Sequence, residues 1–132
     1  MTLPAPQSDL IDLAGRLADA AWQAISPHFR VGVGAENKAD ASRPYDPVTI
    51  ADKAGEEAIR AILAKERPDD GIDGEEFGRN EGSSGWTWLL DPIDGTRAFL
   101  AGLPVWTTLI ALADPDGNPV LGVIDQPVLS ER

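Results

Sequence analysis

The segment WLLDPIDGT (residues 88–96) sets two aspartates, Asp91 and Asp94, directly after an apolar run. Pro92 has a fixed φ and no N–H, so the turn between the aspartates is stiff and both carboxylates can point at one spot. Carboxylates that converge cannot all stay ionised without a cation. Hard oxygen ligands without Cys or His favour Mg²⁺ or a similar ion. The segment therefore predicts a hydrated Mg²⁺ site.

The same segment leads into a short helix, predicted over 96–101 because Gly102 and Pro104 stop it. Gly95 permits close approach of the backbone, and the first N–H groups of a helix have no partner inside it. Such N–H groups are natural ligands for phosphate oxygens. Gly95 and Thr96 are therefore candidate phosphate-binding residues beside the carboxylates.

Two weaker acidic signals lie upstream. GEEFG (74–78) is a glycine-flanked acidic loop that contains Glu75 and Glu76, and DPVTIAD (46–52) ends on Asp52 at the start of a predicted helix. Taken alone, an acidic pair is most often solvated surface, and an Asp that opens a helix is most often a favourable partner for the helix dipole. Neither signal identifies a site without the 88–96 segment.

The remaining pattern predicts two amphipathic helices and three strands. Apolar residues recur at helical spacing in two segments, 8–29 and 50–66. Between and after the helices, residues 30–45 look irregular and 68–85 have the Gly, Asp, Glu and Ser of loops. Strands are predicted at 86–90, where Asp91-Pro92 ends the run, and at 105–113 and 120–125.

Composition narrows the function classes. The 132 residues fit one modest domain, and 11 basic against 22 acidic residues give a formal charge of −11. That charge disfavours nucleic acid and anionic membrane surfaces as partners. The absence of cysteine removes thiolate nucleophiles, zinc–thiolate sites and disulfides. One histidine, His28, makes a multi-histidine metal cage impossible.

Neither a membrane span nor a secretory signal is predicted. The first ten residues, MTLPAPQSDL, have no basic or apolar region of the secretory type, and Gly102 and Pro104 interrupt the apolar stretch 98–113. We therefore expect a cytoplasmic location and no membrane partner.

In this order, the three acidic segments resemble the inositol monophosphatase family of Mg²⁺-dependent phosphomonoesterases. The family's first signature is similar to Trp-x-x-Asp-Pro-Ile-Asp-Gly-Thr-x-x-Phe. This chain has every named residue of it: Trp88, Asp91, Pro92, Ile93, Asp94, Gly95, Thr96 and Phe99. GEE and D-x-V-T-x-x-D are landmarks of the same family. The resemblance implies an α/β (α+β) layered sandwich of the inositol monophosphatase/fructose-bisphosphatase type, with two N-terminal helices on a largely antiparallel sheet.

The resemblance also implies a set of metal ligands. Glu75, Asp91, Asp94 and the backbone carbonyl of Ile93 would hold Mg²⁺, and Glu76 would bind or orient its waters from outside the ligand shell. A metal-bound water would then be the nucleophile. An aspartyl-phosphate enzyme of the haloacid dehalogenase type needs its two aspartates two apart, whereas these are three apart, so no covalent phosphoenzyme is expected.

Three residues would share the catalytic work by similarity. Thr96 would pair with Asp52 and help Glu75 to activate the water, while phosphate would lie over Gly95 and Thr96. The substrate would be a small phosphate monoester. Arg97 and the ending GVIDQP to SER look most like the histidinol-phosphatase branch, which implies histidinol phosphate and histidine biosynthesis, with inositol 1-phosphate or a related sugar or nucleotide phosphate as the alternative.

The resemblance covers only part of a family member. Relatives are about twice as long and carry a second signature, a Trp-Asp before a small-residue helix, which this chain does not contain. Residues 1–132 thus resemble the N-terminal, metal-binding half of a phosphatase domain whose C-terminal layer is missing. We expect weak or no phosphatase activity from this polypeptide alone, and a homodimer in the full-length form.

The sequence offers two alternatives to this interpretation, a calcium-binding loop and a non-catalytic interaction protein. DDGIDG (69–74) is similar to the start of an EF-hand loop, but position three would be Gly71 and position twelve Asn80, where calcium needs an acidic or amide ligand and a bidentate Glu. A non-catalytic protein whose acidic surface binds a basic partner is the second. It predicts that Asp91→Asn leaves function intact.

Overall fold

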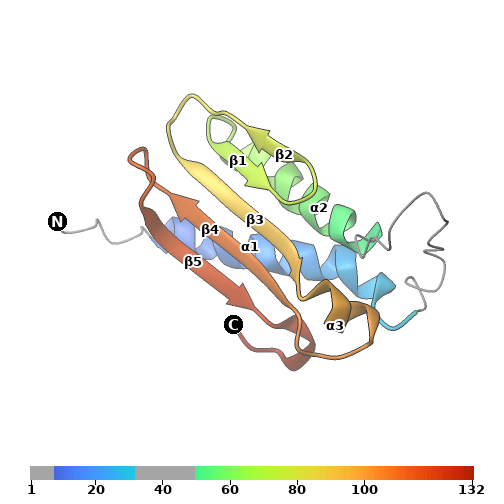
Figure 1. Ribbon diagram of the computed structural model, residues 1–132. Helices are drawn as coiled ribbons and strands as arrows, with labels where there is room; N and C mark the ends of the chain where they lie inside the picture. Colours follow the sequence, from blue (N-terminus) through green and yellow to red (C-terminus); the bar gives the residue numbers. More distant parts are fainter. Residues whose placement is uncertain (1–7, 32–49) are drawn as a thin grey trace.

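The computed structural model describes residues 8–31 and 50–132, which form a helical layer on one sheet (Figure 1). The helices are α1 (Ser8–Ile25), η1 (Ser26–His28), α2 (Ile50–Glu66), α3 (Thr96–Leu100) and η3 (Pro127–Leu129). The strands are β1 (Gly71–Gly74), β2 (Gly78–Asn80), β3 (Thr87–Asp94), β4 (Thr107–Ala113) and β5 (Pro119–Asp125).

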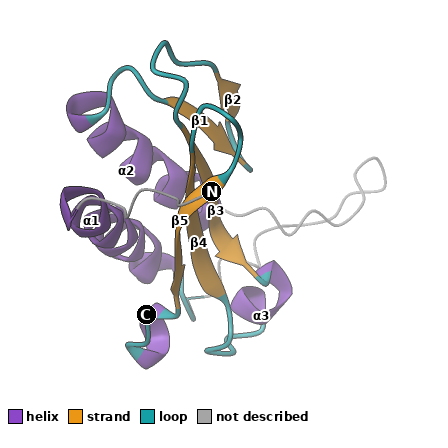
Figure 2. Ribbon diagram, turned by 90° about the vertical axis from the view of Figure 1, so that its left-hand side faces the viewer, coloured by secondary structure: helices purple, strands orange, loops and turns teal. Residues whose placement is uncertain are grey.

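The two long helices pack side by side on one face of the sheet, as Figure 2 shows. Their buried faces follow the helical period: α1 contributes Leu13, Leu17, Ala21 and Ile25, and α2 contributes Ile59 and Leu63. Each fully buried leucine or isoleucine side chain of this set stabilises the fold by about 1.5–3 kcal/mol. The two predicted helices are confirmed, with Pro27 ending the first as a 3₁₀ turn.

The sheet has the strand order β2-β1-β3-β4-β5. Strands β1 and β3 run parallel, whereas the β1–β2, β3–β4 and β4–β5 pairs are antiparallel. The prediction of two helices on a largely antiparallel sheet is therefore confirmed. None of the helices within 8–31 and 50–132 is long and apolar enough to cross a membrane.

The prediction that 68–85 is all loop was wrong, because β1 and β2 lie within it. Strand β1 (GIDG) is too short and too rich in glycine to show alternation, and every residue of β2 is exposed. Pairing with neighbouring strands forms β1 and β2 where the local sequence gives no signal. The backbones of β1 and β2 approach closely, since a Cβ on Gly71 would lie 3.1 Å from the carbonyl oxygen of Asn80. The closeness of the two backbones thus favours a residue without a side chain at this position.

The predicted end of the central strand at Asp91-Pro92 was also wrong, because β3 continues to Asp94. The register with β4 shifts between Asp91 and Asp94, so the proline lies in a bulge where its missing N–H is not needed by the ladder. The Thr108 hydroxyl, which is buried, donates a hydrogen bond to the Pro92 carbonyl at 2.7 Å. This bond fixes the bulge to β4.

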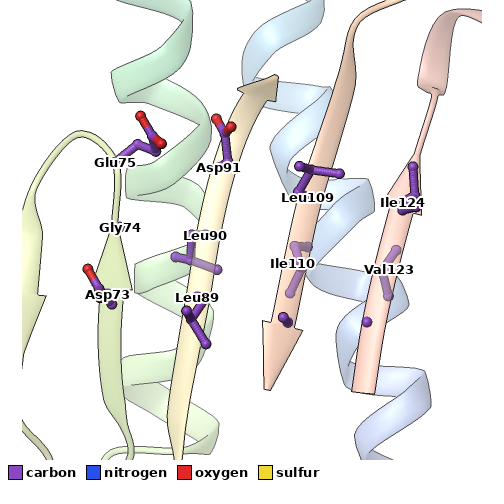
Figure 3. A pocket seen from close by; sticks show the side chains of 12 residues that line it. Asp73, Gly74, Glu75, Leu89, Leu90, Asp91, Leu109, Ile110, Val123 and Ile124 are labelled. Atoms are coloured by element: carbon purple, nitrogen blue, oxygen red, sulfur yellow. The ribbon is translucent and has the colours of Figure 1, made fainter. Parts of the chain in front are cut away.

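The face of the sheet opposite α1 and α2 carries an apolar groove. Alternation along β3 and β4 sends Trp88, Leu90 and Ile110 toward the helices, where they are buried, and leaves Leu89 and Leu109 on the other face. Leu89 is 42% exposed and Ile124 on β5 is 66% exposed. The groove has a volume of about 680 Å³ and ends at the carboxylates of Glu75 and Asp91 (Figure 3).

Candidate active site

The sheet register brings Glu75 and Asp91 together. Gly74 is the partner of Leu90 in the parallel β1–β3 pair, and the Glu75 N–H donates to the Leu90 carbonyl at 3.2 Å. Glu75 and Asp91 therefore occupy neighbouring positions, directly after the last residue pair of the parallel β1–β3 ladder. Figure 3 shows both carboxylates at the same end of the groove, with oxygens directed away from the apolar side chains. The predicted ligands Glu75 and Asp91 thus lie next to each other at one end of the groove.

The electrostatics of Asp91 agree with this geometry. Burial, followed by the negative charges of Glu75, Asp94 and Glu56, raises the pKa of the Asp91 carboxyl from 3.8 to about 6, while a hydrogen bond from the Ile93 backbone opposes the rise. Each of these carboxylates is close enough to act on Asp91, so the charge here is concentrated. A bound divalent cation would reverse that repulsion.

Asp94 and Ile93 lie on the far side of the β3 bulge. Asp94 pairs with Thr107 of β4 and is exposed, and the Ile93 side chain is buried, 3% exposed. The bulge interrupts the ladder between Asp91 and Asp94, so the carbonyl of Ile93 falls within the irregular stretch. The family resemblance predicts this carbonyl as a backbone ligand.

Gly95 and Thr96 form the junction between β3 and α3. Gly95 has a φ of 91°, a left-handed conformation that favours glycine, and its carbonyl accepts the first helical bond from Phe99 N–H at 3.1 Å. The N–H groups of Thr96, Arg97 and Ala98 precede that bond. The predicted start of a short helix at Gly95 and Thr96 is confirmed, and phosphate binding by these two residues stays a prediction.

Asp52 and Glu76, the other two acids singled out in the sequence, do not line the groove. Asp52 is buried, 2% exposed, in the first turn of α2, and half-buried Glu76 follows Glu75 in the turn between β1 and β2. Within residues 8–31 and 50–132, no three His, Asp or Glu side chains are arranged to hold a metal ion. The structure brings Glu75 and Asp91 together, with Asp94 in electrostatic range, and the remaining ligand assignments stay predictions.

The donors that do meet fit Mg²⁺ by chemistry. Glu75 and Asp91 offer hard carboxylate oxygens at a partly exposed edge, where a hydrated ion can keep several waters. The raised pKa of Asp91 records repulsion that a cation would relieve. The residues present therefore suit the group that the sequence implies.

Sequence reasoning missed one residue of this region, Glu56. Its carboxylate is fully buried and lies within electrostatic range of Asp91. The signal was present, because Asp52, Glu56, Ile59 and Leu63 recur at spacings of four, three and four and so share the buried face of α2. A carboxylate on the apolar face of a helix needs hydrogen-bond partners.

The pKa of Asp91 predicts how Mg²⁺ binding depends on pH. Metal ligands must be deprotonated, so affinity should rise as the pH increases through about 6. In the metal-free chain the same shift has the opposite consequence. The folded form holds a proton between 3.8 and about 6 that the unfolded form releases, so the stability contribution of Asp91 falls as the pH rises.

Titration calorimetry at about pH 5 and about pH 7.5 checks this prediction. Binding at the lower pH should be weaker and should release a proton, detected by repeating the titration in buffers of different ionisation enthalpy. Equal affinities at the two pH values would contradict the assignment of Asp91 as a ligand.

Known proteins resemble this chain over most of its length. The profile of the inositol monophosphatase family matches residues 7–132. The chain is 48% identical over 118 residues to the bifunctional phosphatase IMPL2, chloroplastic, of Arabidopsis thaliana. This alignment covers 88% of this chain and 33% of the Arabidopsis protein. The chain is 44% identical over 125 residues to a histidinol-phosphatase of Mycobacterium tuberculosis, covering 94% and 46% respectively.

Solved structures give the same result. An inositol monophosphatase from Zymomonas mobilis superposes with a TM-score of 0.76 at 46% identity, covering 98% of this chain and 47% of that one. The chain thus spans about half the length, or less, of the relatives it matches. A profile match over almost the entire sequence, joined to a shared fold at this identity, leaves one conclusion: the chain belongs to the inositol monophosphatase family.

Proposed function

We propose that this chain forms the metal-binding half of an enzyme that hydrolyses a small phosphate monoester with Mg²⁺. The observation that carries the proposal is the Glu75–Asp91 pair, which the parallel β1–β3 register sets side by side at the end of the groove. Paired carboxylates next to the start of a helix provide both a cation site and an anion site, which is what a phosphate ester with its metal requires.

The proposed ligands are the carboxylates of Glu75, Asp91 and Asp94 and the carbonyl of Ile93, with Glu76 orienting metal-bound water. When bound, Mg²⁺ lowers the pKa of a coordinated water and neutralises charge on the phosphate and the departing oxygen. The carboxylates of this chain would fix the position of that ion at the end of the sheet, because Asp91 lies in β3 and Glu75, the first residue after β1, is hydrogen-bonded through its N–H to the Leu90 carbonyl.

Thr96, Asp52 and Glu75 are the residues proposed to handle the proton of the attacking water. Thr96, oriented by Asp52, would accept a hydrogen bond from this water, and Glu75 would act as the base. The unpaired N–H groups at the start of α3, beside Gly95, would donate to phosphate oxygens. The water would attack phosphorus directly, so the P–O ester bond breaks without a covalent phosphoenzyme.

Histidinol phosphate is the substrate we propose, in agreement with Arg97 and the ending GVIDQP to SER. The similarity to a histidinol-phosphatase of Mycobacterium tuberculosis supports it. Inositol 1-phosphate is the second candidate, favoured by the 46% identity to the Zymomonas mobilis inositol monophosphatase. A homodimer of the full-length form and a cytoplasmic location remain predictions.

Phosphate release tests this function. Alone with Mg²⁺, the chain should turn over histidinol phosphate weakly or not at all, because it spans less than half of the histidinol-phosphatase it resembles. Turnover comparable to that of the Mycobacterium tuberculosis enzyme would refute this expectation.

A chimera tests the same function with the part of the histidinol-phosphatase that this chain does not match. Residues 1–132 joined to the remaining half of the Mycobacterium tuberculosis histidinol-phosphatase should release phosphate from histidinol phosphate only in the presence of Mg²⁺. A folded chimera that binds substrate but remains inactive would contradict a catalytic role for this half.

A further inference from the structure

Glu56 of α2 is a carboxylate buried against the turn that carries the predicted metal ligand Glu75. It is fully buried, and its Oε1 accepts a hydrogen bond from the Glu76 N–H at 2.9 Å. Its Oε2 accepts from the Phe77 N–H at 3.0 Å and from Arg60 Nε at 2.9 Å. Both oxygens are thus committed to the β1–β2 turn and to one neutralising cation.

Arg60 completes the attachment of this turn to α2. Its guanidinium pairs with Glu56 and also donates from Nη2 to the Gly78 carbonyl at 2.6 Å. The Arg60 guanidinium carbon lies 5.9 Å from the centre of the Phe77 ring. Glu56 and Arg60, one helical turn apart on α2, therefore bond the three consecutive residues after Glu75, from Glu76 to Gly78.

The Glu56 carboxylate also restricts which residue can precede Glu75, at position 74. A Cβ added to Gly74 would collide with the carboxylate of Glu56, so a side chain at this position is incompatible with the observed packing. Gly74 is also the last β1 residue paired with β3, opposite Leu90. The glycine of the GEE motif is thus explained by the buried acid rather than by a turn angle.

We propose that Glu56 is a positioning residue that holds Glu75 in register with Asp91. It acts through backbone amides, on the two residues after Glu75 and against the glycine before it, and touches neither substrate nor metal. The inference rests on the proposed function, because Glu75 matters there as a metal ligand. Buried carboxylates bonded to N–H groups make strong, charge-assisted bonds, which suits a fixed support for a site of concentrated negative charge.

Glu56→Gln is the informative variant, and Glu57→Gln is its matched control on the next, exposed position of α2. Glutamine keeps the shape of the side chain but has an NH₂ group in place of one carboxylate oxygen. An NH₂ group cannot accept a hydrogen bond from a backbone N–H. One of the two backbone bonds is therefore lost in Glu56→Gln, whereas Glu57→Gln changes the same charge without touching the turn.

The first measurement is amide hydrogen exchange of the metal-free chain. We expect exchange at Glu76 and Phe77 to accelerate by about tenfold or more in Glu56→Gln, since loss of one hydrogen bond changes a local opening equilibrium by about that factor. Glu57→Gln should exchange like the parent. Unchanged exchange in Glu56→Gln overturns the proposal whether or not the chain binds metal.

The second measurement is Mg²⁺ affinity by calorimetry on the same folded variants. Outer positioning groups typically change metal affinity by about 10–100-fold, so a loss in that range is expected for Glu56→Gln and none for Glu57→Gln. Faster exchange with unchanged affinity would overturn the positioning role. A parent chain that binds no Mg²⁺ would instead refute the proposed function, and the exchange result would still decide whether Glu56 orders the turn.

Arg60→Lys serves if Glu56→Gln does not fold. Lysine keeps a cation beside the buried Glu56 carboxylate and leaves both backbone bonds to Glu56 in place, so the chain should stay folded. The same two readouts should shift in the same direction by a smaller factor, because lysine lacks the planar guanidinium with which Arg60 bonds both Glu56 and the Gly78 carbonyl. Readouts identical to the parent's would overturn the proposal.

Discussion

Asp91→Asn should abolish Mg²⁺ binding by this chain while leaving it folded. The substitution keeps the shape of the side chain but removes the negative charge that lies beside Glu75. Loss of an outer positioning group already costs about 10–100-fold in metal affinity, so loss of a direct charged ligand should cost at least about a hundredfold. Calorimetry at neutral pH measures this directly.

The metal-free Asp91→Asn variant should also be more stable than the parent at neutral pH. The parent holds a partly buried charge among three other carboxylates, which is the cause of its raised pKa, and the neutral amide removes that repulsion. Reduced metal affinity with increased thermal stability is a signature that simple misfolding cannot produce.

Asp73→Asn is the matched control, because Asp73 also lines the groove but lies level with Leu89, away from the carboxylate pair (Figure 3). It should bind Mg²⁺ like the parent. If Asp91→Asn also binds like the parent, the metal site is not where the register of β1 and β3 predicts it. That result is the one expected of a non-catalytic acidic interaction protein.

Asp70→Ala should cost about 1–3 kcal/mol of unfolding free energy, the range for leaving a buried hydrogen-bond donor without its partner, because the Arg67 side chain is 33% exposed and stays solvated. The Asp70 carboxylate accepts bonds from Arg67 at 2.6 and 3.2 Å, from the Ser84 hydroxyl at 2.7 Å and from the indole N–H of Trp88 at 2.9 Å. Trp88 is fully buried, so its N–H would be left without a partner.

Equilibrium urea unfolding checks this value, with Asp69→Ala as the control. Asp69 is the exposed neighbour, so its loss should change stability by no more than about 0.5 kcal/mol. A cost below about 1 kcal/mol for Asp70→Ala would mean that the network around Trp88 does not hold the α2–β1 connection to β3. If Asp70→Ala fails to fold, Asp70→Asn should show a smaller loss in the same direction.

The sequence carried enough information for the helices and the main strands. Period alone located α1 and α2, and the runs around β4 and β5 located those strands to within two residues. Two apolar residues within the periodic segments 8–29 and 50–66, Ile11 and Ile50, are nevertheless 53% and 66% exposed. A helical period marks which side is buried but not where the neighbouring layer ends.

The parts that sequence reasoning missed depend on contacts between distant segments. Strand β1 exists because β3 supplies a parallel partner, and no pattern within GIDG indicates this. The bulge at Pro92 depends on the Thr108 hydroxyl, sixteen residues away in sequence. Glu56 could have been noticed as an acid on an apolar face, but its partners at 76 and 77 are known only from the fold.

Anomalous diffraction from crystals of the chain grown with Mn²⁺ in place of Mg²⁺ shows directly whether the carboxylate pair is a metal site. We expect a peak between Glu75 and Asp91, about 2.0–2.6 Å from an oxygen of each, and closer approach of Asp94 than in the metal-free structure. Ordered carboxylates with no peak between them, at saturating Mn²⁺ and neutral pH, would contradict the proposed metal site and the phosphatase function built on it.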